Sequence, residues 1–197
     1  MSIKNTGLKY IKNIFSTDEI IRLNYECQKS INLRDQVSKG TLFIGNSDIR
    51  GYVKTMYTPR ISLFPIYRCK KIIESIIGEK IFPTYWFTTF YYPGSFLGPH
   101  FDNEACELSM SINLNIHDNN WNLNFIDLQE REQNINVKPK DGIFYFGNKL
   151  FHWRERLDNT SKCHAQLFLH YVRSNGKYND LKYNTKKEIK EYILKKV

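Results

Sequence analysis

The chain has 197 residues, of which 41% are hydrophobic and 15% aromatic, and this composition excludes a disordered or low-complexity protein. The length fits a single domain that can bury a sizeable core. Lys and Arg outnumber Asp and Glu by 29 to 20, so the net charge of +9 leaves a nucleic-acid partner open. No apolar run approaches the ~20 residues of a membrane span, and no secretion signal is visible. We therefore expect a cytoplasmic protein that makes no membrane contact.

Two helices are predicted before the first long strand. Residues 16–31 carry apolar side chains at helical spacing, and Ser16 and Glu19 at their start form a capping box. Residues 65–77 form the second predicted helix, which begins at a proline suited to a first turn and stops at the following glycine. Between them, glycines interrupt residues 40–57, where we expect an excursion of strand and loop.

From residue 84 onward the sequence favours strands separated by turns. The predicted strands cover residues 84–92, 108–116, 121–128, 142–146 and 162–172. This order predicts a mainly β fold with N-terminal helices (α+β), arranged as a double-stranded β-helix or jelly roll. We expect one domain in three parts: a helical support over 1–80, the β-helix core over 81–175, and a basic tail or helix over 176–197.

A set of metal ligands is predicted around the triplet His100-Phe101-Asp102. In an extended segment, residues two apart point to the same side, so His100 and Asp102 can bind one ion together. His152, which follows the strand at 142–146, is the best third ligand. Two histidines and one carboxylate leave three metal positions open, as in non-haem iron(II) oxygenases. The predicted metal is therefore iron(II).

Two longer segments carry a family resemblance. The sequence YYPGSFLGPHFD at 91–102 and the sequence VKPKDGIFYFGNKLFHW at 137–153 contain the HxD pair and the distal histidine, respectively. Here the chain resembles the 2-oxoglutarate/iron(II)-dependent dioxygenases, specifically the prolyl-4-hydroxylase-like branch, over about residues 82–172. The resemblance implies 2-oxoglutarate and O₂ as cosubstrates, and a hydroxylase that oxidises a C–H bond of a small-molecule or peptidyl substrate and releases succinate and CO₂. The usual Gly-Gly-x-Thr segment is missing, so prolyl specificity does not transfer.

The resemblance also implies a cation for the distal carboxylate of 2-oxoglutarate, about ten residues beyond the second histidine. Lys162 lies ten positions after His152, where it is predicted to open the last strand and point into the barrel. If the register is shifted, the alternatives are His164, Gln166 and Arg154.

The remaining predicted contacts come from the strands beside these motifs. Tyr92 is placed like the tyrosine that can hydrogen-bond the cosubstrate in such enzymes, with Tyr85 and Tyr91 as alternatives. Ser111 and Asn113 lie on the polar face of the strand after the HxD pair, where they are candidates to line the pocket.

Two other functions are compatible with the sequence. A nucleic-acid dealkylase of the AlkB type would use the same iron and cosubstrate, and the positive net charge fits it. That group requires two arginines on the last strands, however, and this chain has none between Arg156 and Arg173, so nucleic acid is not favoured. The other alternative is a non-catalytic jelly-roll binding protein, in which the histidines would not converge on a metal site.

Overall fold

The computed structural model describes residues 3–37, 49–50, 53–57, 63–117, 120–159 and 162–183. The helices are α1 (Ile3–Thr6), α2 (Thr17–Val37) and α3 (Leu63–Ile77), with short 3₁₀ turns η2 (Glu104–Cys106) and η3 (Asn179–Leu181). The strands are β1 (Leu8–Ile11), β2 (Ile49–Arg50), β3 (Val53–Tyr57), β4 (Ile81–Tyr91), β5 (Phe96–His100), β6 (Leu108–Asn113), β7 (Leu123–Ile126), β8 (Glu132–Ile135), β9 (Gly142–Tyr145), β10 (Phe151–Arg154) and β11 (His164–Arg173).

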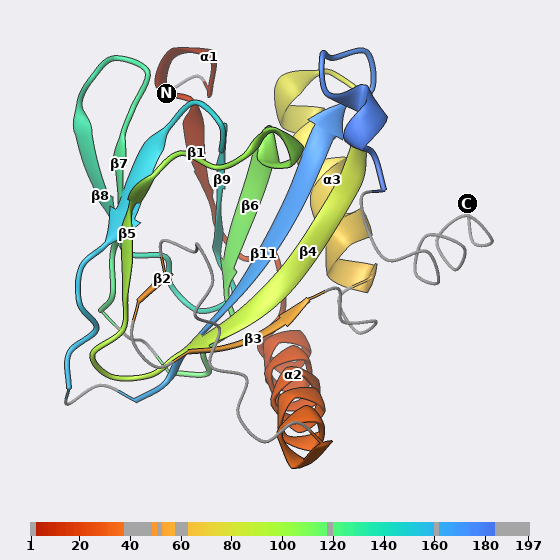
Figure 1. Cartoon of the computed structure of the whole chain (residues 1–197). Helices are drawn as coiled ribbons and strands as arrows, with labels where there is room; N and C mark the ends of the chain where they lie inside the picture. The colour runs from red at the N-terminus through yellow and green to blue at the C-terminus, as the bar shows by residue number, and fades with distance from the viewer. Residues whose placement is uncertain are drawn as a thin grey trace.

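The strands form two sheets that enclose the interior of a jelly roll (Figure 1). The larger sheet has the order β1-β9-β6-β11-β4-β3, and the smaller has the order β2-β5-β10-β7-β8. Strand neighbours that are far apart in the sequence pair antiparallel, as β11 does with both β4 and β6. The predicted fold class, mainly β with N-terminal helices, is confirmed.

Both predicted helices are present, and the start of α2 and the end of α3 follow the predicted chemistry. The backbone N–H of Ser16 donates to Glu19 Oε2 at 2.9 Å, and the backbone N–H of Glu19 donates to Ser16 Oγ at 3.2 Å. The helix α2 runs six residues beyond the predicted end, because no glycine or proline interrupts the chain there. The helix α3 stops at Gly78, whose positive φ of 75° is a left-handed conformation that glycine adopts at little cost.

The main hydrophobic core lies between these helices and the larger sheet. In Figure 1, α3 lies behind β4 and β11. Each strand of the larger sheet sends alternate side chains toward the helices. The cluster includes Ile20, Leu23 and Cys27 from α2, Ile66, Cys69 and Ile73 from α3, and Trp86, Phe90, Met110, Ile112, Leu167 and Leu169 from the sheet. The opposite face of the same sheet is therefore left to line the interior of the jelly roll.

The strand content of the chain is larger than predicted. The described residues contain eleven strands rather than about five, and residues 1–80 supply three of them in addition to helices. Strands β1, β2 and β3 pair with β9, β5 and β4, respectively. Most of the unpredicted strands have only two to five residues, too few for a period-2 pattern to stand out.

Parts of the predicted excursion and tail lie outside the described residues. Strands β2 and β3 belong to the segment 40–57, whereas residues 40–48, 51–52 and 184–197 are not described. Among the described helices, none is both long and apolar enough to cross a membrane.

Candidate metal centre

The three predicted metal ligands converge at one end of the smaller sheet. His100 is the last residue of β5, and it lies directly opposite His152 of β10 in the antiparallel pair. Their ring centroids are 4.2 Å apart. Asp102 follows β5 by two residues, and its Oδ1 lies 3.6 Å from His100 Nε2 and 3.7 Å from His152 Nε2. One ligand atom from each residue lies within 4.8 Å of the others, which is close enough for a shared ion.

Backbone carbonyls fix the protonation of both imidazoles. Nδ1 of His100 lies 2.9 Å from the carbonyl oxygen of Gly98, and Nδ1 of His152 lies 2.9 Å from that of Leu150. A carbonyl oxygen can only accept, so each Nδ1 carries the proton and donates. With Nδ1 protonated, each ring turns its Nε2 toward Asp102. This is the tautomer that a metal-ligating histidine requires, and the second-layer carbonyls hold the rings in orientation.

Burial and charge act in opposite directions at these ligands. Burial alone would raise the pKa of Asp102, but the hydrogen bond with His100 and the neighbouring imidazoles lower it to about 2. Burial lowers the pKa of His152 below its usual value, and Asp102 only partly opposes that shift. Both groups are thus held in the ionisation state that binds a cation. The donor set of two imidazoles and one carboxylate fits iron(II).

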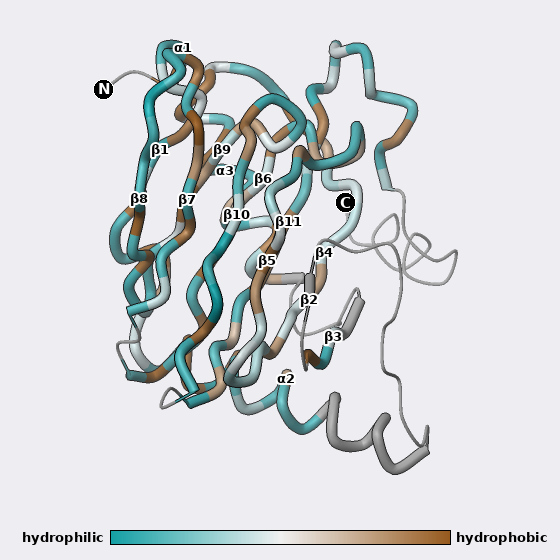
Figure 2. The backbone as a smooth tube through the Cα atoms, turned by 60° about the vertical axis from the view of Figure 1, so that its left-hand side comes forward, coloured by the Kyte–Doolittle hydropathy of each residue, from teal (hydrophilic) through white to brown (hydrophobic). Residues whose placement is uncertain are grey.

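A second polar group lies behind the metal ligands, in the interior between the sheets. The side chain of Arg154 follows His152 by two residues on β10 and is only 2% exposed. Figure 2 shows β10 as a strongly hydrophilic stretch beside hydrophobic segments of β5 and β7. Nη1 of Arg154 donates to the carbonyl oxygen of Trp121 at 2.6 Å, and Nη2 donates to Gln166 Oε1 at 3.3 Å. The guanidinium also lies over the Trp121 ring, 4.5 Å from its centroid.

The guanidinium of Arg154 is incompletely satisfied. Its Nε is buried without a hydrogen-bond partner in the described part of the chain. Burial lowers the pKa of Arg154 to about 10, which still leaves the group charged at neutral pH. A buried cation is costly unless an anion pairs with it. The interior therefore presents a site for an anionic group, two residues along β10 from a metal ligand.

Gln166 connects Arg154 to a buried polar network on the larger sheet. Oε1 of Gln166 also lies 2.8 Å from His164 Nε2, and its Nε2 donates to Ser111 Oγ at 2.7 Å. Nδ1 of His164 lies 2.8 Å from Asn115 Nδ2. Burial, with a smaller contribution from Arg154, lowers the pKa of His164 to about 3, so this ring is neutral and donates from Nε2. His164 and Gln166 thus contact each other and the Arg154 region, as two members of one network.

Two of the predicted contacts lie elsewhere. Lys162 is exposed and precedes β11, which begins only at His164. The prediction that Lys162 opens the last strand and points into the barrel is wrong. The alternation of side chains along β11 starts only at His164, so it does not fix the direction of the Lys162 side chain. Tyr92 lies one residue after β4 and packs on the helix-side core. Its neighbour Tyr91 has the opposite orientation, and its ring lies 4.9 Å from that of Trp121 in the interior.

The interior face of the larger sheet also carries residues that the sequence did not indicate. Ser109 Oγ donates to Asp102 Oδ2 at 3.0 Å and lies 2.9 Å from His170 Nδ1. Burial lowers the pKa of His170 to about 4, although Asp102 opposes that shift, so this ring is also neutral. The alternation of 108–113 places Ser109 on the inward face, but its contact with Asp102 depends on the connection through η2, which packs against β11 and β4.

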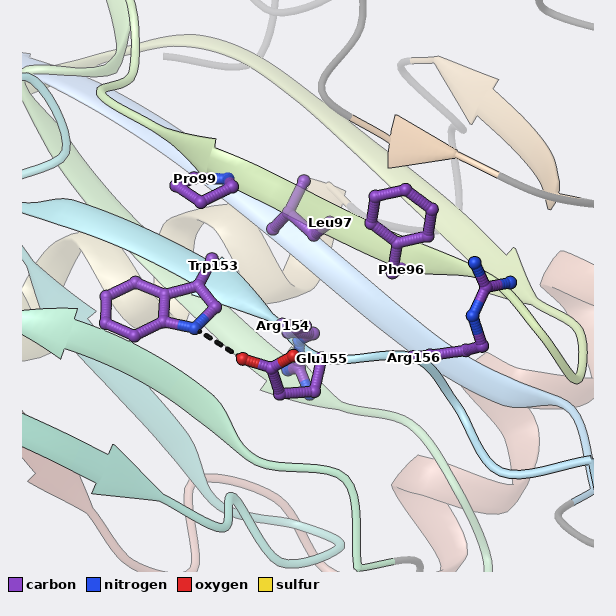
Figure 3. Close-up of a pocket in the computed structure, with 7 residues that line it drawn as sticks. All are labelled: Phe96, Leu97, Pro99, Trp153, Arg154, Glu155 and Arg156. Carbon is purple, nitrogen blue, oxygen red and sulfur yellow. Dashed lines mark hydrogen bonds between the residues drawn. The ribbon is translucent and has the colours of Figure 1, made fainter.

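A groove lies along β5 and β10 of the smaller sheet. Its lining comes from β5, β10 and the residues after β10: Phe96, Leu97, Pro99, Trp153, Arg154, Glu155 and Arg156. Figure 3 shows the ring of Trp153 beside Glu155, to which its Nε1 donates at 2.9 Å. Trp153 alternates along β10 with His152 and Arg154, which are buried in the interior. The lining of the groove thus includes Arg154 but none of the three candidate metal ligands.

Structural comparison places the fold among known oxygenases. The Pseudomonas putida prolyl-4-hydroxylase matches with a TM-score of 0.66 at 13% identity, over 87% of this chain and 95% of that one. The collagen prolyl hydroxylase of Paramecium Bursaria Chlorella virus-1, solved with 2-oxoglutarate, matches with a TM-score of 0.61 at 12% identity, over 85% and 97%. The alpha-ketoglutarate-dependent carbocyclase SnoK of nogalamycin biosynthesis matches with a TM-score of 0.69 at 11% identity, over 86% and 81%.

These similarities are similarities of fold. No family model matches the chain, and no curated protein matches its sequence. The chain has the jelly-roll architecture of these solved enzymes, and the fold expected from the two sequence motifs is confirmed.

Proposed function

We propose that the protein is a 2-oxoglutarate- and iron(II)-dependent oxygenase that hydroxylates a C–H bond of a small-molecule or peptidyl substrate. The observation that carries the proposal is the juxtaposition of two sites on β10. His152 completes a set of two imidazoles and one carboxylate, and Arg154 offers an unsatisfied buried cation two residues further on. The fold shared with prolyl-4-hydroxylases supports the same conclusion.

Arg154 is our candidate for the residue that binds the distal carboxylate of 2-oxoglutarate. Two residues of a strand advance about 7 Å, which suits a five-carbon diacid whose other end chelates the metal. A planar guanidinium can donate two parallel hydrogen bonds to a carboxylate. Gln166 holds the guanidinium from the larger sheet, and His164 in turn holds the amide of Gln166. Lys162, the residue favoured by spacing, is exposed and lies outside β11.

The residues of the chain then have separate tasks. Iron(II) with 2-oxoglutarate and O₂ supplies oxidative C–H chemistry, and succinate and CO₂ are released. His100, Asp102 and His152 hold the metal, while Arg154 orients the cosubstrate. His100 is the more exposed of the two imidazoles at the candidate metal site, with 17% of its side chain accessible against 3% for His152. We infer that the substrate approaches from the side of His100, and that the buried interior keeps water from the other side.

The proposal is tested by succinate formation. Wild-type protein, supplied with iron(II), 2-oxoglutarate and air, is expected to form succinate, and a screen of metabolites and peptides should identify compounds that stimulate it. Asp102→Ala removes the carboxylate ligand and is expected to abolish the activity. Lys162→Ala is the matched control, because its side chain is exposed, and it should retain full activity. Wild-type protein that forms no succinate and binds no iron(II) would instead favour the non-catalytic binding protein.

A further inference from the structure

The two oxygens of the Asp102 carboxylate have different surroundings. Oδ1 faces the Nε2 atoms of His100 and His152 at 3.6 and 3.7 Å. Oδ2 points away from them and accepts a hydrogen bond from Ser109 Oγ at 3.0 Å. The backbone N–H of Asp102 also donates to the carbonyl oxygen of Gly147 at 3.1 Å, which fixes the main chain from which the carboxylate projects.

The protons around Ser109 can be assigned from these contacts. Its hydroxyl has one hydrogen, and the ionised carboxylate of Asp102 is both nearer and a stronger acceptor than the carbonyl oxygen of Cys106, which lies 3.3 Å away. When Ser109 donates to Asp102, its oxygen accepts from Nδ1 of His170, which lies 2.9 Å away. In this arrangement His170 carries a proton on Nδ1.

Gly147 closes the other side of the same carboxylate. A Cβ atom at this position would collide with Asp102 Oδ2, with the carbonyl oxygen of Cys106 and with Ser109 Oγ. The backbone of residue 147 can approach the carboxylate this closely only because glycine has no side chain. Asp102 Oδ2 is thus enclosed by a hydroxyl on one side and a bare backbone on the other.

We propose that Ser109, His170 and Gly147 form a carboxylate seat that holds Asp102 with Oδ2 turned inward, so that only Oδ1 reaches the metal. The inference rests on the proposed metal site and deepens it. A carboxylate free to rotate could bind through both oxygens and would then occupy an additional coordination position. The seat keeps that position for the cosubstrates. Ser109 and His170 are positioning residues in this account, since neither has to touch the metal.

Cobalt(II) titration of the full chain tests the seat without depending on turnover. The visible absorption of bound cobalt(II) reports affinity and coordination number together. Removal of a residue that orients a metal ligand typically lowers affinity about 10–100-fold. Ser109→Ala is expected to weaken cobalt(II) binding by that factor and to change the band intensity. His170→Phe keeps a ring beside Tyr85 and Phe87 but removes the donor, and it should act in the same direction.

The controls separate positioning from folding. Ser111→Ala removes the next inward hydroxyl on β6, which contacts Gln166 rather than Asp102, and it should leave cobalt(II) affinity and spectrum unchanged. His170→Asn can restore a donor toward Ser109 and should recover part of the affinity. Thermal unfolding of each variant without metal shows whether the fold persists.

The outcomes distinguish this inference from the proposed function. If wild-type protein binds neither cobalt(II) nor iron(II), the metal site is refuted, and so is the seat, which depends on that site. If wild-type protein binds cobalt(II) and folded Ser109→Ala and His170→Phe bind it equally well with the same spectrum, the seat is refuted while the metal site stands. Weaker binding and a changed spectrum in both variants, with Ser111→Ala unaffected, would support the seat.

Discussion

Arg154 and Gln166 join the two sheets through the interior of the jelly roll, with Arg154 Nη2 donating to Gln166 Oε1 at 3.3 Å. Arg154 belongs to the smaller sheet and Gln166 to the larger one. The same amide oxygen accepts from His164, so its direction is set from both sides. Gln166 of the larger sheet therefore positions the guanidinium that we assign to the cosubstrate, although Arg154 itself belongs to the smaller sheet.

Arg154→Leu is expected to raise the KM for 2-oxoglutarate by two orders of magnitude or more. Loss of one partner of a buried ion pair costs about 3–5 kcal/mol, and each 1.4 kcal/mol corresponds to about tenfold. Steady-state kinetics with varied 2-oxoglutarate measures the effect, and cobalt(II) affinity without cosubstrate should change little. The exposed Lys162→Ala serves as the control. An unchanged KM in Arg154→Leu, with a raised KM in Lys162→Ala, would reverse our assignment.

Gln166→Glu tests the same pocket by adding a charge. The substituted carboxylate would pair with Arg154 and compete with the distal carboxylate of 2-oxoglutarate, so the KM should rise at least about tenfold, given the strength of buried charge pairs. Gln166→Leu removes the hydrogen bonds without adding a charge and should have the smaller effect. If Gln166→Glu binds 2-oxoglutarate as well as wild-type protein, the cosubstrate carboxylate lies elsewhere.

His152→Ala should eliminate the iron complex that wild-type protein forms. Without air, iron(II) and 2-oxoglutarate together are expected to give a weak visible charge-transfer band, because the three protein ligands leave room for a chelating cosubstrate. Loss of one imidazole should abolish the band and lower iron(II) affinity, as followed by anaerobic absorption titration. Retention of the full band and full affinity in the folded variant would remove His152 from the ligand set.

Stability of the metal-free protein should fall as the pH is lowered below about 6.5. Burial lowers the pKa of His164 to about 3 and that of His170 to about 4, against 6.5 in the unfolded chain. The stability that these neutral rings provide is fully present above pH 6.5. Below pH 6.5, these two histidines bind protons in the unfolded chain but stay neutral in the folded chain. Together they lower the free energy of unfolding by up to about 2.7 kcal/mol per pH unit.

Urea unfolding at pH 7 and at pH 5, with a chelator present, measures this decline. The chosen window lies above the range in which most carboxylates titrate. His170→Phe removes one of these groups and should reduce the slope, while His164 and His152, whose pKa burial also lowers, keep the remainder. Equal unfolding free energies at both pH values would show that the two histidines are not buried in the neutral form.

The convergence of His100, Asp102 and His152 was predictable from two local patterns together with the resemblance of the two longer segments. Two residues two apart on an extended segment share a side, and His152 follows an aromatic strand. The cation was predicted at Lys162 because a fixed spacing was applied across a loop, and β11 begins two residues later than that spacing assumes. The period-2 alternation of β10 gives a better signal, because it places Arg154 on the same face as His152. Ser109 and Gly147 approach Asp102 only through tertiary folding, which no single segment encodes.

The two faces of the larger sheet differ in composition: one is apolar and packs on the helices, and the other carries the polar network of the interior. On β11, Leu167 and Leu169 pack toward the helices, whereas Gln166 and His170 face the interior with its polar network. Substitutions on the interior face leave this main hydrophobic cluster intact and act instead on the polar network and on two smaller buried clusters. Sequence change on the inner face can therefore proceed while the helix-side cluster keeps its packing, provided the three candidate metal ligands are retained.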